Sequence, residues 1–156
     1  MAMDRLFQLM KEKSASDMFF AVNSPVHIKI NGTMVPINQQ KLDNANILAL
    51  LAGAAAVVFP VDDLWGKVDL PIVLLEAMAL GVPVIVLDRG PLQDLQGVLK
   101  VPSLDAASWL TQIASLLADS ARCAALVANQ RAALAERHAA AVVARAYEDL
   151  YLELAH

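Results

Sequence analysis

The sequence has little of what marks several common classes of protein. It contains one cysteine, Cys123, so an internal disulfide is excluded and a reducing, cytoplasmic location is expected. The net charge is −4. A dedicated nucleic-acid binder has an excess of basic residues, so no nucleic-acid partner is expected. No basic segment followed by an apolar one opens the chain, and we therefore expect no signal peptide.

Long apolar runs and clusters of metal-binding side chains are also lacking. The longest apolar run, from Ile47 to Val61, is too short to cross a bilayer, so no membrane span is predicted. The histidines do not lie near Cys123 or near carboxylates at the spacing of metal ligands, and no metal site is predicted (His27, His138 and His156).

Motifs of nucleophilic or ATP-dependent catalysis are absent as well. There is no G-x-x-x-x-G-K-[ST] phosphate loop and no G-x-S-x-G elbow, so we expect neither ATP hydrolysis nor a serine nucleophile. Asp62-Asp63 can be interpreted as a general-acid pair or as solvated residues of an exposed loop. We predict no catalytic residue and no cofactor for the chain alone.

The most informative stretch that is present runs from Val57 to Asp88. It predicts a buried strand over 57–59, a polar loop over 62–69, a helix over 71–80 and a second buried strand over 84–87. Asp69 stands where a helix N-cap belongs, and Gly81 with Pro83 ends the helix. Two fully apolar strands joined by a helix favour parallel pairing with a right-handed crossover.

The start of this helix offers a seat for a phosphate group. The backbone N–H groups of Leu70, Ile72 and Val73 lie at a helix N-terminus, where unpaired donors and the helix dipole favour an anion. Glu76 lies one turn further on, within reach of a ribose diol, or simply on a surface helix. Lys67 is a candidate for a diphosphate contact, or a solvent-facing lysine.

The segment KVDLPIVLLEAMALGVPVIVLDRG resembles the nucleotide-sugar site of retaining glycosyltransferases (group 1) built from two Rossmann-like domains. The resemblance extends from about Ala52 to Leu154. It implies nucleotide-sugar binding at the loop and helix over 66–76, by Lys67, Asp69, Ile72, Val73 and Glu76. Two glutamates flank this loop in that family. Glu76 matches the second, and the first falls on Val68, so that contact is missing or is replaced by Asp69 or Lys67.

The first third of the chain has a different pattern. It predicts a helix over 1–13, strands over 18–22, 26–30 and 33–37, and a second helix from Asp43 to Leu51. Asn31-Gly32 is a strong hairpin signal. The segment SDMFFAVNSPVHIKINGTMVPINQQKLD resembles the N-terminal module of type IV pilus retraction ATPases, especially the accessory paralogue. That resemblance implies a PAS-like module without catalytic residues.

The last third predicts a strand over 98–101 and then helices. Ser103 is the expected N-cap of a helix over 104–118, in which Trp109 serves packing. Asp119-Ser120 starts a long Ala-rich helix to about Ala155, with a kink near Arg137-His138.

Together these patterns predict an α/β fold. We expect a mixed sheet with an antiparallel N-terminal hairpin region and a parallel half-Rossmann (βαβ) part, covered by helices, and a long C-terminal helix. The segments 1–50 and 51–156 are expected to pack as one composite domain, whether by fusion or by design, that self-associates as a homodimer or higher oligomer. Three functions stay open: a composite with at most weak anion or nucleotide-sugar binding, a glycosyltransferase fragment that needs a partner domain, and a pilus assembly module.

Overall fold

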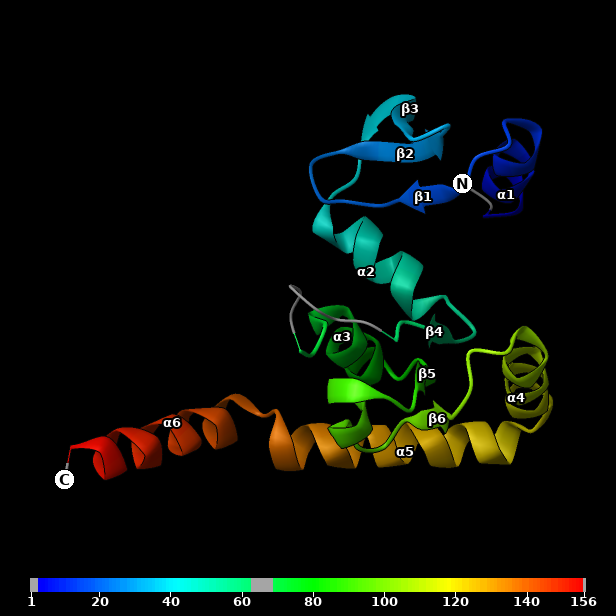
Figure 1. The fold of residues 1–156 in the computed structure, drawn as a ribbon. Coiled ribbons are helices and arrows are strands. Elements are labelled where there is room, and N and C mark those ends of the chain that lie inside the picture. Colours follow the sequence, from blue (N-terminus) through cyan, green and yellow to red (C-terminus); the bar gives the residue numbers. More distant parts are fainter. Residues whose placement is uncertain (1–2, 63–68, 156) are drawn as a thin grey trace. The chain divides into compact units, whose positions relative to one another are not determined.

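The computed structural model describes residues 3–62 and 69–155, and the chain divides into two compact units, 1–50 and 51–156. Figure 1 shows helices and strands in both. The predicted α/β class is confirmed, with antiparallel strands in the first unit and parallel strands with a βαβ connection in the second. The six strands among the described residues form two three-stranded sheets, however, and not one mixed sheet.

The first unit is built around an antiparallel sheet of order β1-β2-β3. Its elements are α1 (Met3–Glu12), β1 (Asp17–Phe19), β2 (Pro25–Ile30), β3 (Thr33–Lys41) and α2 (Asn44–Ala52), whose last residues belong to the second unit. The expected strand 18–22 is shorter and earlier, and the expected strand 33–37 continues to Lys41.

The Asn31-Gly32 hairpin is confirmed. Both residues have positive φ, 48° and 81°, as a two-residue hairpin turn requires, and they set Ile30 opposite Thr33. The short turn brings β2 and β3 together at little cost in loop entropy. Leu6, Val26 and Ile28 form the buried apolar centre of this unit.

The second unit is a βαβ arrangement around a parallel sheet of order β4-β5-β6. Its elements are β4 (Val57–Phe59), α3 (Ile72–Leu80), β5 (Val84–Leu87), the 3-10 helix η1 (Gly90–Asp94), β6 (Leu99–Val101), α4 (Ala106–Ala118), α5 (Ser120–Arg137) and α6 (Ala140–Leu154). The expected bounds of β4 and β5 are confirmed, and β6 is one residue shorter than the predicted strand.

The central strand β5 is buried on both faces, as its fully apolar sequence predicts. Val84 and Val86 belong to a cluster with α3 and α5, whereas Ile85 and Leu87 belong to a second cluster with α4. Trp109 packs in that second cluster, 6% exposed, and its Nε1 donates to the Ser103 carbonyl at 2.7 Å. The predicted packing role of the tryptophan is therefore confirmed.

The predicted starts of α4 and α5 can be compared with the observed N-cap residues. Asp105, not Ser103, caps α4, because the helix begins two residues later than expected and the Asp105 carboxylate accepts from the Ser108 N–H. Asp119 caps α5 as predicted, accepting from the Arg122 N–H at 2.9 Å. The long helix is broken between Arg137 and Ala140, which confirms the kink.

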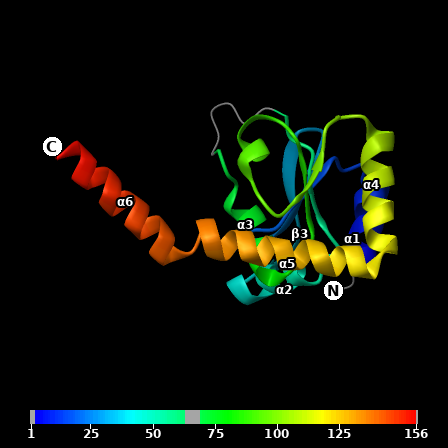
Figure 2. The same ribbon diagram turned by 90° about the horizontal axis from the view of Figure 1, so that it is seen from below.

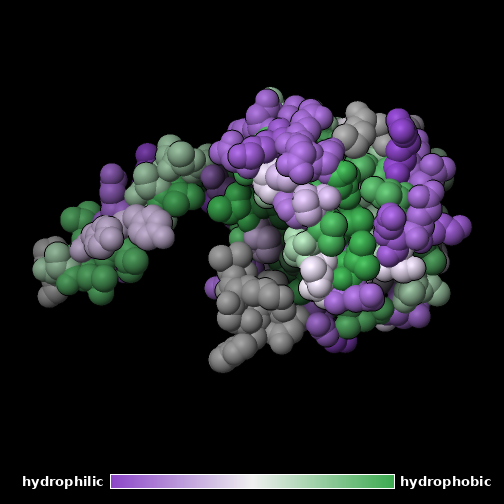
Figure 3. Space-filling view, turned by 90° about the horizontal axis from the view of Figure 1, so that it is seen from above, coloured by the Kyte–Doolittle hydropathy of each residue, from purple (hydrophilic) through white to green (hydrophobic). Residues whose placement is uncertain are grey.

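The last helix extends beyond the other helices of its unit (Figure 2). All its residues are exposed, and apolar side chains make up much of its surface (Figure 3), including Val143, Tyr147, Leu150 and Leu154. Within residues 3–62 and 69–155 no single helix has the length and hydropathy to cross a membrane. Only α4 and the stretch Ser120–Leu154 taken together have that length and hydropathy, and the two are bent by 99° relative to each other.

Candidate functional site

The candidate site lies where α3 begins, after the loop that follows β4. Pro71 is the N-cap residue, with extended backbone angles (φ −62°, ψ 123°), and no side chain caps the helix there. The expected cap at Asp69 is therefore wrong. Proline suits this position because it has no N–H to satisfy and resists helical backbone angles in the residue before it.

The first turn of α3 presents backbone donors. Ile72 and Val73 donate no backbone hydrogen bond to any described residue, whereas the Leu74 N–H bonds the Pro71 carbonyl at 3.0 Å. The side chains of Ile72 and Val73 are 69% and 43% exposed. The buried face of the helix is formed by Leu74, Ala77 and Met78.

The structure describes some of the other predicted site residues and not others. Asp69 and Glu76 are exposed, and Glu76 lies one helical turn after Ile72 on α3. Lys67 and Val68 lie outside the described residues, as does Asp63. Asp62 is exposed beyond the end of β4. The structure thus carries Asp69, Ile72, Val73 and Glu76 on one loop and helix start, and Lys67 is not described.

The α3 start belongs to the edge of the parallel sheet where ligands of open α/β sheets bind. The β4–α3 loop leaves the carboxyl end of β4, and Asp88 and Arg89 follow the carboxyl end of β5. Arg89 is exposed and precedes η1, at a turn where Gly90 has a φ of 55°. The sequence analysis did not single out this arginine, although a cation directly after a buried parallel strand is a usable signal.

A cavity of about 570 Å³ adjoins the same loop. It is lined by Asp69, Leu70, Pro91, Asp94, Leu95, Glu136, Arg137, His138 and Val142. Three carboxylates face one guanidinium and one imidazole there, so the cavity is not suited to a diphosphate. The favourable place for an anion is the helix start itself. No group of three or more His, Cys, Asp or Glu arranged for a metal ion occurs in the described parts of the chain.

One buried polar residue of the second unit was not predicted. Gln130 of α5 is fully buried, its Nε2 donates to the Val82 carbonyl at 2.9 Å, and its Oε1 accepts from the Val84 N–H at 3.1 Å. It therefore joins α5 to the turn between α3 and β5. A polar residue in an Ala-rich helix normally indicates an exposed face, so nothing in the local pattern identified it.

A Rossmann-like βαβ unit with an open helix start at its carboxyl edge is a nucleotide-binding architecture. Comparison with known families supports a more specific assignment: residues 27–119 match the family described as glycosyl transferases group 1. The chain belongs to this family. No curated protein and no solved structure matches it significantly.

The match has different limits from the expected ones. It begins at residue 27, within the segment that resembles pilus ATPases, and not near Ala52. It ends at residue 119, before α5 and α6, whereas the resemblance was expected to reach Leu154. None of the comparisons supports the pilus ATPase resemblance.

Proposed function

We propose that this chain binds the diphosphate of a nucleotide-sugar, weakly, at the first turn of α3. The observation that carries the proposal is the pair of N–H groups of Ile72 and Val73, which bond no carbonyl among the described residues, at the carboxyl edge of a parallel sheet. Membership of the group 1 glycosyl transferases supports the choice of ligand. The helix dipole adds about 0.3–1 kcal/mol for one exposed anionic charge.

The ribose of the nucleotide is assigned to Glu76. Its carboxylate is exposed one turn beyond the N–H groups of Ile72 and Val73, so a nucleotide held at the helix start can place its diol there. Carboxylate oxygens accept hydrogen bonds from both hydroxyls of a diol. The family's first glutamate falls on Val68, and we assign its contact to Asp69 or Lys67.

Glycosyl transfer itself is assigned to an assembly with a partner domain that binds the acceptor. Catalysis requires donor and acceptor to be held in one geometry, and the described residues of the second unit form a single parallel sheet of three strands. We therefore expect millimolar binding and no transfer by this chain alone.

The test removes one N–H group without removing the helix. Ile72 is the first residue of α3, a position where proline is tolerated, and Pro71 before it already has the extended angles that a following proline requires. Ile72→Pro should weaken binding of UDP-glucose or GDP-mannose, measured by calorimetry, by about fivefold or more, because a hydrogen bond to a charged group is lost. The matched control, Ile72→Ala, loses the same side chain but keeps the N–H and should bind normally.

A second pair of variants tests the ribose contact. Glu76→Ala should abolish the measurable nucleotide-sugar affinity and change the free energy of unfolding by less than about 0.5 kcal/mol, because the side chain is exposed. Glu148→Ala, an exposed glutamate of α6, is the control. Equal binding by the Ile72→Pro and Ile72→Ala variants would remove the helix start from the site, and unchanged binding by Glu76→Ala would remove Glu76.

A composite origin is the second candidate, favoured by the division of the chain after residue 50 and by the separate sheet in each unit. Under this hypothesis the first unit is an independent, pilus-like module without catalytic residues. A family match that begins at residue 27 speaks against a clean junction at residue 50. One continuous natural gene covering both units would show that the junction was not engineered.

A further inference from the structure

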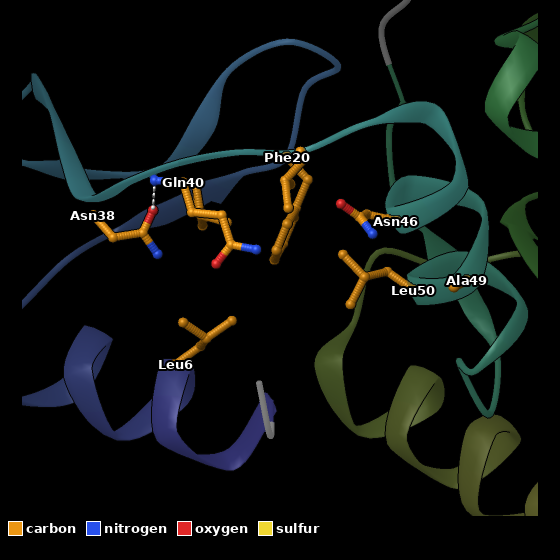
Figure 4. Close-up of a pocket in the computed structure, with 9 residues that line it drawn as sticks. Leu6, Phe20, Asn38, Gln40, Asn46, Ala49 and Leu50 are labelled. Atoms are coloured by element: carbon orange, nitrogen blue, oxygen red, sulfur yellow. Dashed lines mark hydrogen bonds between the residues drawn. The ribbon is translucent and has the colours of Figure 1, made fainter.

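The first unit contains a cavity that the nucleotide-sugar proposal does not use. Its volume is about 310 Å³, at the lower end of the range for small-molecule sites. It lies among α1, the sheet and α2, and it is lined by Leu6, Phe20, Val26, Asn38, Gln40, Leu42, Asn46, Ala49 and Leu50. Figure 4 shows Asn38 and Gln40 reaching down from β3 towards Leu6, with Phe20 beside them and Asn46 on α2.

The polar groups of this cavity are three carboxamides. The Asn38 Oδ1 accepts from the Gln40 N–H at 3.1 Å, and the Asn46 Oδ1 accepts from the Asp43 N–H at 3.2 Å. Because these backbone donors fix the two oxygens, the NH₂ groups of Asn38 and Asn46 are the parts left for another partner. The Gln40 amide has no hydrogen-bond partner among the described residues, so it offers both a donor and an acceptor.

The apolar part of the lining suits a flat ring. Phe20 supplies an aromatic face, and Leu6, Val26 and Leu50 close the cavity with aliphatic side chains. Among the described residues, no Asp, Glu, Lys, Arg or His lines it, so none of them would offset the charge of an ionised ligand. These features exclude a phosphate or a carboxylate and favour a neutral, planar molecule.

We propose that this cavity binds a neutral planar heterocycle with an imide or lactam edge, in which a ring N–H lies beside carbonyl groups. Its carbonyl oxygens accept from the NH₂ groups of Asn38 and Asn46, its ring N–H donates to the Gln40 Oε1, and its ring packs on Phe20. The three amides come from two elements, β3 and α2, so an occupant would also join these elements.

Uracil is the probe, titrated into the whole chain and followed by the side-chain amide signals in nitrogen–proton correlation spectra. We expect shifts at Asn38, Gln40 and Asn46 with a dissociation constant of about 1 mM or less. Two other compounds serve as controls. 1,3-Dimethyluracil lacks the ring N–H, and indole lacks the carbonyl groups, so each should bind at least about tenfold more weakly.

Two variants complete the test. Gln40→Leu should weaken uracil binding at least about tenfold, whereas Gln39→Leu should leave it unchanged, because Gln39 is exposed and its side chain does not line the cavity. Both positions are exposed, so both variants should keep the native spectrum. The proposal is overturned if uracil causes no shifts at these amides, if indole binds as tightly, or if Gln40→Leu binds as well as Gln39→Leu. Because UDP-glucose and GDP-mannose carry bases with such an edge, binding at α3 is judged from the Ile72 and Glu76 variants and not from these results.

Discussion

At the scale of single residues, Gln130 has the largest structural role among the polar side chains described. Its side chain is fully buried. The amide nitrogen donates to the Val82 carbonyl and the amide oxygen accepts from the Val84 N–H, on either side of Pro83. Proline has no N–H, so the chain cannot use that residue as a donor where it enters β5. The side chain of Gln130 supplies hydrogen-bond partners to the Val82 carbonyl and the Val84 N–H on either side of this proline.

Replacing Gln130 by leucine should therefore be costly. The substitution leaves the Val82 carbonyl and the Val84 N–H buried without partners, and each such group costs about 1–3 kcal/mol. We expect Gln130→Leu to lower the free energy of unfolding by at least about 2 kcal/mol in a urea titration. Asn129→Leu, at the exposed neighbouring position of α5, should change it by less than about 0.5 kcal/mol. Similar midpoints for the two variants would contradict this account.

At the scale of elements, two glycines allow the backbone to end a helix or to approach another helix closely. Gly81 ends α3 in the left-handed conformation (φ 76°), and the Gly81 and Val82 N–H groups bond carbonyls of the last turn. Gly97, with φ 77°, lies so close to α5 that an added Cβ would be 2.7 Å from the Asn129 carbonyl oxygen. Both glycines are required by backbone conformation, and Gly97 also by the close approach of α5 to the segment before β6.

The cap of α4 makes a pH-dependent contribution to stability. Hydrogen bonds from the Ser108 backbone N–H, and then from its hydroxyl, lower the pKa of Asp105 below its ordinary value of 3.8. Because the folded pKa is the lower one, this contribution is fully present above the ordinary value and is lost as pH falls through the folded pKa.

Comparison with Asp105→Asn tests this dependence, because asparagine caps a helix but does not titrate. We expect the melting temperature of the wild type to exceed that of the variant at pH 6 and the two to converge as pH falls below about 3.8. A difference that stays constant from pH 6 to pH 2.5 would show that the carboxylate's charge is not involved.

At the scale of the whole molecule, the two units differ in how much core each has. The second contains two apolar clusters, one on each side of β5, whereas the first has three buried apolar side chains, Leu6, Val26 and Ile28. A segment of about 50 residues buries too little surface to be reliably stable alone. The exposed apolar side chains of α6 also support the proposal that copies of the chain associate.

Separate expression of residues 1–50 and 51–156, with hydrogen exchange as the measurement, tests this difference. We expect 51–156 to protect the β5 amides as well as the whole chain does, and 1–50 to lose most of the protection of β2 and β3. Full protection in the isolated 1–50 segment would show two independent domains. Loss of β5 protection in 51–156 would show that its core depends on the first unit.

The sequence by itself determined the local features. The apolar runs of β4 and β5 predicted buried parallel strands, Asn31-Gly32 predicted the hairpin, Asp119 the start of α5, and the LLEAMALGVPV segment the family. These features succeed because each depends on neighbouring residues, through turn conformation, capping or the burial of a continuous run.

Only the tertiary structure decided how the strands are grouped and which polar residue is buried. Whether the N-terminal strands pair with β4 depends on contacts between residues far apart in the chain, and the described strands form two separate sheets. Gln130 is buried where its amide bonds backbone groups on either side of Pro83. Side chains of β3 and α2, which are distant from α1 in sequence, line the cavity of the first unit together with Leu6. Such contacts join residues that are distant in sequence, so no local pattern of residues predicts them.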